Sequence, residues 1–243
     1  MAVLEKLSSS LSSVFAETDR VFRLNGLNQI TYPFFKRNTQ PVSAQSTYVE
    51  LLKCSLIPFD YRSVAEGFFG KMTTGCGQSE ADHADVSRFC GEILISIATN
   101  VILSIEYRYA GIRYSEHKRE VIVLAGQNQL MEALGVALDG VGFNEKSWCV
   151  MTEAAAGLCF MQLCIGVTVE CKYVAPDRRD FVDRLCAMLA HLKQEVVDSV
   201  QREVEHDLIV RNMLGRVFQY TVMYTPREGI LITSNSRKPW HRY

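Results

Sequence analysis

An almost unbroken apolar run in the second half of the sequence limits what the chain can fold into. Within residues 154–169 only Gln162 and Thr168 are polar. A helix that spans a membrane needs about 20 predominantly apolar residues, whereas this run is shorter and is bracketed by two glutamates. We therefore expect residues 147–174 to form a helix that is buried among other helices of a globular protein.

A second apolar stretch, residues 93–105, contains serine, threonine and asparagine as well as many β-branched residues. β-branched residues are common in strands, so a strand is a real alternative here. The apolar pattern continues well beyond the usual strand length of about five to six residues. It therefore favours a helix over about residues 84–107.

Helical spacing of apolar residues recurs along the rest of the chain. Asp60 is a suitable N-cap for a helix whose apolar face includes Phe68. After Pro176 we expect one long helix that runs to about Met213 or breaks near His206 and restarts, with an apolar stripe on one face and Lys193 among the charged residues of the other. The other helices predicted from this spacing cover residues 2–15, 48–56 and 118–138.

Together these patterns predict an all-α protein of two domains. The first domain, residues 1–174, is expected to be a multi-helix bundle made of two small bundles that split near residues 74–84. The second, residues 175–243, is expected to be a helical domain with one long helix and a short tail. The boundary is placed at residues 174–178, because a proline there starts a new segment.

Composition indicates a globular protein, since 48% of the residues are apolar and 22% are charged. The formal net charge is −1, so contact with nucleic acid or a membrane requires a local basic patch. The first residues lack a basic region followed by a long apolar one, and we therefore expect no signal peptide. The eight cysteines lie mostly in apolar surroundings, which indicates buried, reduced thiols in the cytosol or nucleus.

Few residues are candidates for catalysis. The sequence contains none of the common nucleophile, phosphate-binding, dinucleotide-binding or zinc-protease motifs. His83, with Asp82 and Asp85 beside it, is able to bind a metal or transfer a proton, although a solvated acidic loop is the better interpretation. We therefore predict that the protein is not an enzyme and uses no cofactor.

Cys159, Cys164 and Cys171 are the candidate ligands for a metal site. Structural zinc sites use close pairs of cysteines that are matched by a second pair of cysteines or histidines. Here the first two cysteines are five residues apart, and the next histidine is His191. The spacing favours small apolar side chains in a crowded core, and no metal is predicted.

Basic residues are the candidate contacts with phosphate groups or lipid headgroups. Those in residues 108–119 are interleaved with Tyr107, Tyr109 and Tyr114. Cations and aromatic rings together bind phosphates and bases in some proteins, and more often they form an ordinary helix end with cation–π contacts. The candidate membrane or nucleic-acid contacts are Arg20, Arg23, Lys36, Arg37, Arg108, Arg113, Lys118 and Arg119.

Several fragments resemble, in the same order, segments of the matrix protein of orthomyxoviruses, the influenza-type viruses. They are YVELLKCSLIPFDYRSVAEGFFGKM (48–72), DVSRFCGEIL (85–94), IEYRYAGIRYSEHKREVI (105–122) and MTEAAAGLCFMQLC (151–164). The resemblance covers about residues 1–165. Two features depart from that family: its lysine-arginine-rich helix is here YRYAGIRY, and its Cys-Cys-His-His segment is not reproduced.

The resemblance implies an all-helical structural protein of the virion. Such a protein would associate with copies of itself beneath the envelope and bridge the anionic inner leaflet and the viral ribonucleoprotein, with RNA as a further partner. It would occur in the virion and in the host cytoplasm and nucleus. A non-enzymatic matrix protein is thus the leading hypothesis; the alternatives are a helical RNA-binding nucleoprotein and a helical regulator that binds a partner's amphipathic helix.

Overall fold

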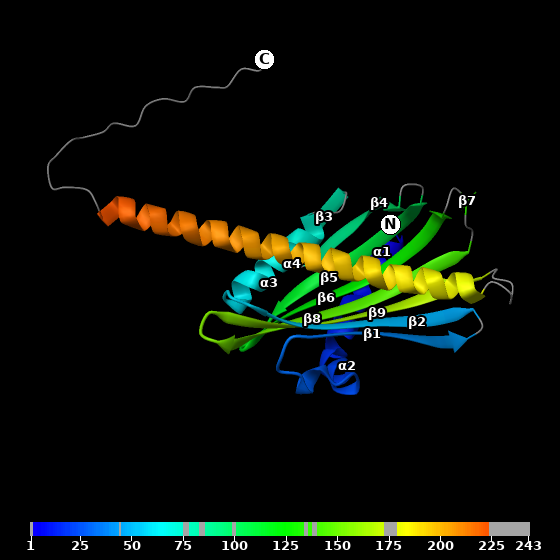
Figure 1. Ribbon diagram of the computed structural model, residues 1–243, viewed down its shortest axis with the longest axis horizontal. Coiled ribbons are helices and arrows are strands. Elements are labelled where there is room, and N and C mark those ends of the chain that lie inside the picture. The colour runs from blue at the N-terminus through cyan, green and yellow to red at the C-terminus, as the bar shows by residue number, and fades with distance from the viewer. Residues whose placement is uncertain are drawn as a thin grey trace, which may run out of the picture. The chain divides into compact units, whose positions relative to one another are not determined.

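The molecule is mixed α and β. The computed structural model describes residues 2–43, 45–74, 78–82, 86–98, 101–133, 136–137, 140–172 and 179–223. The chain divides into two compact units, residues 1–208 (unit 1) and residues 209–243 (unit 2). Unit 1 contains an antiparallel sheet with helices packed against its two faces (Figure 1).

The helices precede, interrupt and follow the strands in the sequence. They are α1 (Ala2–Ala16), α2 (Thr18–Leu24), the 3-10 helix η1 (Leu27–Gln29), α3 (Tyr61–Thr74) and α4 (Arg179–Met223). The strands are β1 (Phe34–Ser43), β2 (Ser46–Ile57), β3 (Gln78–Asp82), β4 (Val86–Ala98), β5 (Val101–Ser115), β6 (Arg119–Ala133), β7 (Val136–Ala137), β8 (Val141–Ala155) and β9 (Leu158–Cys171). Among the described residues these make one nine-stranded sheet, in the order β1-β2-β9-β8-β6-β5-β4-β3, with β7 paired to β6.

One face of the sheet, which we call the α4 face, packs against α3 and the part of α4 that belongs to unit 1. Phe68 of α3 and Leu189, Val197 and Val204 of α4 are buried there. Every second residue of β9 belongs to the hydrophobic core on this face: Cys159, Met161, Leu163, Ile165, Val167, Val169 and Cys171. This alternation follows from the two-residue period of a strand.

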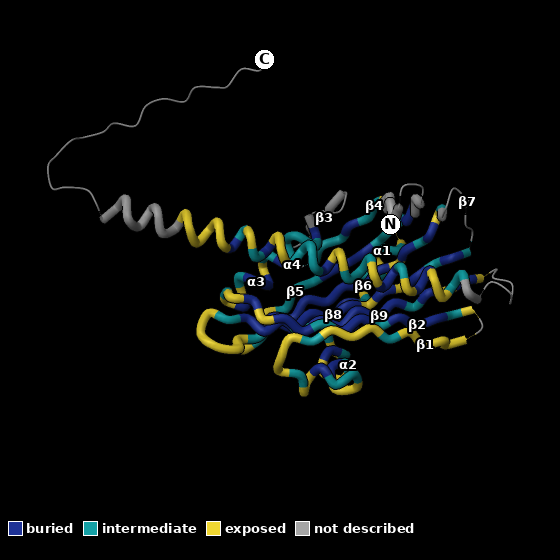
Figure 2. The backbone as a smooth tube through the Cα atoms, in the orientation of Figure 1, coloured by how far each residue is buried: buried dark blue, intermediate teal, exposed yellow. Residues whose placement is uncertain are grey.

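The opposite face, which we call the α1 face, is covered by α1, α2 and η1. Leu11 and Val14 of α1 are buried against the intervening residues of the strands, which include Trp148 and Cys164. The indole Nε1 of Trp148 donates a hydrogen bond to the carbonyl oxygen of Val14, 2.8 Å away. The central strands are therefore buried on both faces, whereas most of β1 at the sheet edge is exposed (Figure 2).

The predicted all-α fold class is wrong, and so is the predicted N-terminal multi-helix bundle. A strand covered on both faces is apolar at nearly every position and loses the alternation that identifies strands in a sequence. In the segments 48–56, 84–107 and 118–138, which were expected to be helices, the described residues lie in β2, in β4 and β5, and in β6 and β7, apart from Lys118, which precedes β6.

The long apolar run is a β-hairpin rather than a helix. Residues 154–155 end β8, residues 158–169 lie in β9, and Gly157 between them has a φ of +72°. Glycine adopts this left-handed conformation readily, which allows the chain to reverse within two residues. Gln162, a polar residue in the run, donates a hydrogen bond from its Nε2 to the carbonyl oxygen of Leu27, 2.6 Å away.

Three predicted helices are confirmed. Residues 2–15 lie in α1, the helix after Asp60 is α3, and the long distal helix is α4. As expected, Asp60 caps α3: its Oδ2 accepts a hydrogen bond from the backbone N–H of Ser63 at 3.0 Å. No helix in the described ranges is long and apolar enough to cross a membrane.

The fragments that resemble the orthomyxovirus matrix protein lie mostly on strands. Residues 48–57 are in β2, 86–94 in β4, 105–115 in β5 and 151–155 in β8. The all-α character implied by the resemblance is therefore wrong, and the viral matrix assignment loses the support that it drew from that fold. The predicted domain boundary at residues 174–178 lies outside the described residues.

Candidate functional site

A cavity of about 560 Å³ lies in unit 1 between the α4 face of the sheet, α3 and α4. Most of its lining side chains are apolar. Phe68 and Met72 of α3 reach it from successive turns, and Leu192, Val196 and Val200 of α4 do the same. Residues three and four apart share one helix face, which is why these positions line a common wall.

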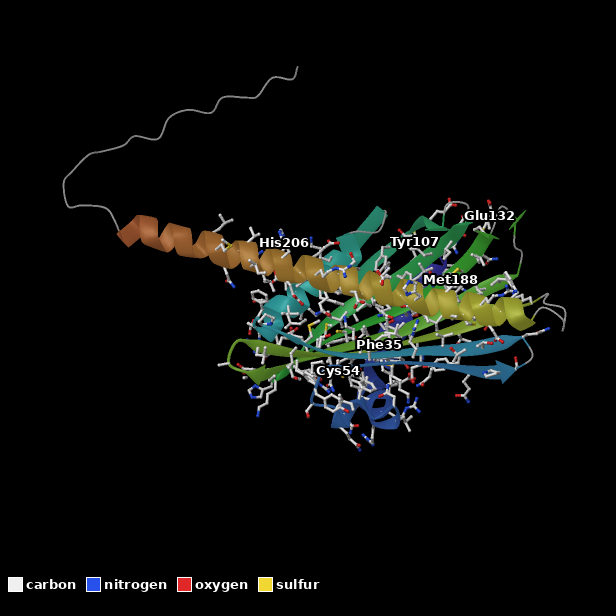
Figure 3. The ribbon with its side chains drawn as sticks, in the orientation of Figure 1. Phe35, Cys54, Tyr107, Glu132, Met188 and His206 are labelled. Atoms are coloured by element: carbon white, nitrogen blue, oxygen red, sulfur yellow. The ribbon has the colours of Figure 1, made fainter. Side chains whose placement is uncertain are left out.

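The sheet forms the other wall through the inward positions of five strands. Tyr107, labelled in Figure 3, lies on β5 and lines this wall, as do Phe143 of β8 and Leu163 of β9. Because these positions alternate with residues that face α1, the strands supply a nearly continuous apolar surface to the cavity.

Five polar side chains gather at this surface, and we call them the Lys193 cluster. They come from β5, β6, β8 and α4: Tyr109, Asn128, Glu145, Ser147 and Lys193. All of them line the cavity. Tyr109, Asn128, Glu145 and Ser147 are buried, whereas about 25% of the Lys193 side chain remains accessible.

The carboxylate of Glu145 is the centre of the cluster. Its Oε2 lies 2.6 Å from Nζ of Lys193 and accepts a hydrogen bond from the Tyr109 hydroxyl group at 2.7 Å. Its Oε1 accepts a hydrogen bond from the Ser147 hydroxyl group at 2.8 Å. Lys193 and Asn128 also donate to the Tyr109 hydroxyl oxygen, at 2.7 and 3.0 Å.

A glycine makes this geometry possible. Register pairs Tyr109 of β5 with Gly126 of β6, and Gly126 with Glu145 of β8. A Cβ atom on Gly126 would lie only 2.1 Å from Cε1 of Tyr109. The tyrosine ring therefore lies across β6 at the one position without a side chain, and its hydroxyl group reaches Glu145 two strands away.

Electrostatics fix the charge of the cluster. Burial raises the pKa of Glu145, but the charge of Lys193 and hydrogen bonds from Lys193, Tyr109 and Ser147 outweigh it, so that the pKa lies below its ordinary value. Burial lowers the pKa of Lys193, but Glu145 and Tyr109 outweigh this effect and raise it overall. The pKa of Tyr109 is raised by burial and by the charge of Glu145. At neutral pH the cluster thus holds one carboxylate, one ammonium and a neutral phenol.

This arrangement is better suited to binding than to proton transfer. General acid–base catalysis is most effective when a pKa lies near the working pH, whereas the pKa values of Glu145, Lys193 and Tyr109 are all displaced away from neutrality. Cys149 also lines the cavity, but burial raises the pKa of its thiol, which disfavours the nucleophilic thiolate.

The cysteines proposed and rejected as metal ligands do not converge. Cys159 and Cys171 lie on the α4 face, whereas Cys164 lies on the α1 face. Burial raises the pKa of the thiols of Cys159 and Cys164 to about 12. No group of three or more His, Cys, Asp or Glu residues in the described part of the chain is placed to hold a metal ion. His83 and Asp85 lie outside the described residues.

The predicted basic contacts are distributed over several elements. Arg20 and Arg23 are on α2, Lys36 and Arg37 on β1, Arg108 and Arg113 on β5, Lys118 in the turn before β6, and Arg119 at the start of β6. The structure brings Arg119 and Arg23 close to the same carboxylate, Asp19, which lies 2.5 Å from Nη1 of Arg119.

Carboxylates offset several of these charges. Arg119 also pairs with Glu116, and Arg108 pairs with Glu106. Nε of Arg113 lies 3.9 Å from Oε2 of Glu120, and Arg37 lies over the ring of Phe35 at 5.8 Å from its centroid. None of the eight basic residues lines the cavity. Their contact with a membrane or nucleic acid stays a prediction.

The Lys193 cluster was not identified from the sequence. Lys193 was assigned to the charged face of the distal helix, whereas it points into the cavity with Leu189 and Leu192. Its position could have been inferred from the sequence, because Lys193 lies four residues after Leu189 and therefore on the apolar face of the helix. Glu145 carried a similar signal, since it lies two residues after Phe143 on the same face of β8.

Comparisons with known proteins give weak similarities. No family model matches the sequence, and no curated protein matches it. Among solved structures, the Zhui aromatase/cyclase from Streptomyces sp. R1128 has a TM-score of 0.42 and 12% identity, over 66% of this chain and 96% of that chain. The human StarD13 (DLC2) lipid transfer and protein localization domain has a TM-score of 0.34 and 9% identity, over 70% of this chain and 92% of that chain.

A conserved protein from Geobacillus kaustophilus has a TM-score of 0.35 and 13% identity, over 64% of this chain and 94% of that chain. These similarities are too low to carry a functional argument.

Proposed function

We propose that unit 1 binds a mainly apolar small molecule in the cavity between the sheet and α4. The observation that carries this proposal is the cavity itself: about 560 Å³, apolar over most of its lining, with the Lys193 cluster on the sheet side and Lys71, Ser199 and Glu203 as further polar lining residues. Ligand sites in proteins typically measure about 300–1,000 Å³ and combine apolar walls with a few fixed polar groups.

The volume limits the size of the ligand. One water molecule occupies about 30 Å³ of liquid, so the cavity accepts on the order of 20 non-hydrogen atoms. Drug-sized ligands gain about 0.3 kcal/mol per non-hydrogen atom. The expected binding free energy is therefore about −6 kcal/mol, which corresponds to a Kd of tens of micromolar.

Polar contacts hold α4 over the cavity. Nζ of Lys53 on β2 lies 2.6 Å from Oδ1 of Asp198, and Nζ of Lys71 on α3 lies 3.4 Å from Glu203 and 3.0 Å from Asp207. These ion pairs tie the helix to a strand and to α3. A bound molecule would therefore be enclosed between elements that are already in contact.

Binding is proposed here without turnover. The names of two similar structures mention an aromatase/cyclase and a lipid transfer domain, and those activities belong to those proteins. The absence of enzyme activity stays a prediction from the sequence. Self-association, contact with the anionic inner leaflet, ribonucleoprotein or RNA, and location in a virion also stay predictions, for which liposome flotation and filter binding are the direct tests.

Titration of the full chain with N-phenyl-1-naphthylamine, a neutral apolar dye, tests the proposal. We expect saturable fluorescence with one site per chain. The variant Val200→Trp, which adds a large ring to the cavity lining, should abolish the signal. The matched control is Val210→Trp, at an exposed position of the same helix outside the cavity lining.

Circular dichroism establishes that both variants are folded. Dye binding that is absent from the native chain, or that is equal in the two folded variants, contradicts the proposed site.

A further inference from the structure

We propose that the cavity selects apolar molecules that carry an uncharged hydrogen-bond acceptor, such as a ketone oxygen, over those that carry a carboxylate, and that Lys193 donates to this acceptor. The proposal rests on the proposed function, since it names the class of ligand for the same cavity.

The ammonium group of Lys193 has spare donor capacity. It carries three N–H bonds, and its partners among the described residues are Oε2 of Glu145 at 2.6 Å and the hydroxyl oxygen of Tyr109 at 2.7 Å. One N–H bond is therefore left for a further acceptor. Lys193 lines the cavity, so an acceptor on a bound molecule is within its reach.

The other polar atoms around Lys193 have their main partners within the cluster. Tyr109 donates its hydroxyl hydrogen to Glu145 and accepts from Lys193 and Asn128. The two oxygens of Glu145 accept from three donors, one of which is Ser147. This makes the lysine the most suitable donor for a ligand.

Charge balance decides which acceptor fits. The cluster contains one carboxylate and one ammonium, and its net charge is therefore zero. A neutral oxygen uses the third N–H of Lys193 and leaves the ion pair intact. A carboxylate has to share Lys193 with Glu145, which places two like charges side by side in a mostly apolar cavity.

The alternative for a carboxylate ligand is also unfavourable. If the ligand displaced Glu145 from Lys193, the Glu145 carboxylate would keep only its hydroxyl donors while 5% exposed. Removing the counter-charge of a buried ion is strongly destabilising. Because the displaced pKa values keep Glu145 and Lys193 ionised at neutral pH, protonation does not relieve the conflict.

Three ligands with one tail test this inference: decan-2-one, decanoate and decane. Each is measured by displacement of N-phenyl-1-naphthylamine from the full chain at pH 7. We expect decan-2-one to bind about tenfold more tightly than decane, because it gains a hydrogen bond from a charged donor. We expect decanoate to bind at least about tenfold more weakly than decan-2-one.

Two variants assign the preference to particular side chains. Glu145→Gln keeps the shape and removes the negative charge, so Lys193 becomes an unmatched cation and the order should invert in favour of decanoate. Lys193→Met removes the donor, and decan-2-one and decane should then bind alike. The matched control is Lys146→Met, which removes a lysine paired with Glu17 outside the cavity lining and should keep the native order.

The outcomes separate the two proposals. If neither the dye nor any of the three ligands binds the native chain, the proposed function itself fails. If they bind but decanoate matches or exceeds decan-2-one in the native chain, only the selectivity inference fails. A preference for decan-2-one that survives Lys193→Met overturns the role of Lys193, and this result does not require Glu145→Gln to fold.

Discussion

Gly126→Ala is the substitution that most directly challenges the geometry of the Lys193 cluster. The added methyl carbon would lie 2.1 Å from Cε1 and 2.5 Å from Cδ1 of Tyr109, whereas carbon atoms pack best at about 3.5–4.0 Å. The ring has little freedom to retreat, because it stacks on Phe89 with centroids 5.4 Å apart and its hydroxyl group has three partners. We expect the tyrosine to be displaced and its hydrogen bonds to weaken.

The free-energy change has three contributions. Overpacking costs about 1–3 kcal/mol, and weaker hydrogen bonds between Tyr109 and charged groups cost about 1.5–3 kcal/mol more. Replacing a glycine inside a strand by alanine returns about 0.5–1 kcal/mol. The free energy of unfolding should therefore fall by roughly 2–5 kcal/mol, measured from urea titrations of the full chain.

Two further chains make this test specific. Gly142→Ala in β8 adds a methyl group that meets only the carbonyl oxygen of Asn128, at the ordinary distance of 3.5 Å. It should destabilise by less than about 0.5 kcal/mol. In a Tyr109→Ala background, Gly126→Ala should lose most of its cost, since the ring it meets is gone. The reasoning is refuted if Gly126→Ala and Gly142→Ala lower the free energy of unfolding equally, or if Gly126→Ala lowers it as much in the Tyr109→Ala background as in the native chain.

Three other perturbations test the core, a helix cap and the ion pair, each by urea unfolding. Phe68→Ala, at a fully buried position against the sheet, should lower the free energy of unfolding by about 3–5 kcal/mol. Asp60→Ala removes the cap on Ser63 and should cost about 1 kcal/mol, whereas Asp60→Asn should retain most of it. The lowered pKa of Glu145 predicts stability that is fully present above its ordinary value of about 4.5 and is lost as the pH falls through the folded-state pKa. Glu145→Gln should therefore show a smaller loss of stability between pH 6 and pH 3 than the native chain.

The helices were predictable from the sequence because each covers the sheet on one side only. In α3 the buried residues Val64, Ala65 and Phe68 repeat at helical spacing, and the cap at Asp60 fixes the start. The same one-sided burial in α4 produces its apolar stripe. The sequence pattern and the packing therefore agree for these elements.

The strands were not predictable by the same reasoning. In β9 the odd-numbered residues from Cys159 to Cys171 face α4, while Phe160 and Cys164 face α1. Apolar residues therefore occur on both faces of the strand, and the two-residue period of a strand is not visible in the sequence. In β8 the buried and exposed positions do alternate over residues 141–147, but the buried ones include Glu145 and Ser147. Polar residues at inward positions hide a strand from a pattern based on hydrophobicity.

The site depends on register, which the sequence does not display. Tyr109 and Glu145 are 36 residues apart and become neighbours because the strand between them carries a glycine where they cross. Lys193 joins them from a helix 84 residues beyond the tyrosine. The identity of the basic residues was visible in the sequence, but their carboxylate partners, such as Asp19 for Arg119, came only from the fold.

The order of the elements along the chain has a consequence for synthesis. All of the strands in the described part of the chain precede α4, yet Leu189 and Val197 of this helix are buried against them. A ribosome therefore delivers the sheet before the helix that shields one of its oily surfaces. A nascent chain that pauses in this interval exposes apolar surface, which binds chaperones and promotes aggregation. The rate at which α4 is translated therefore sets how long this face of the sheet remains uncovered.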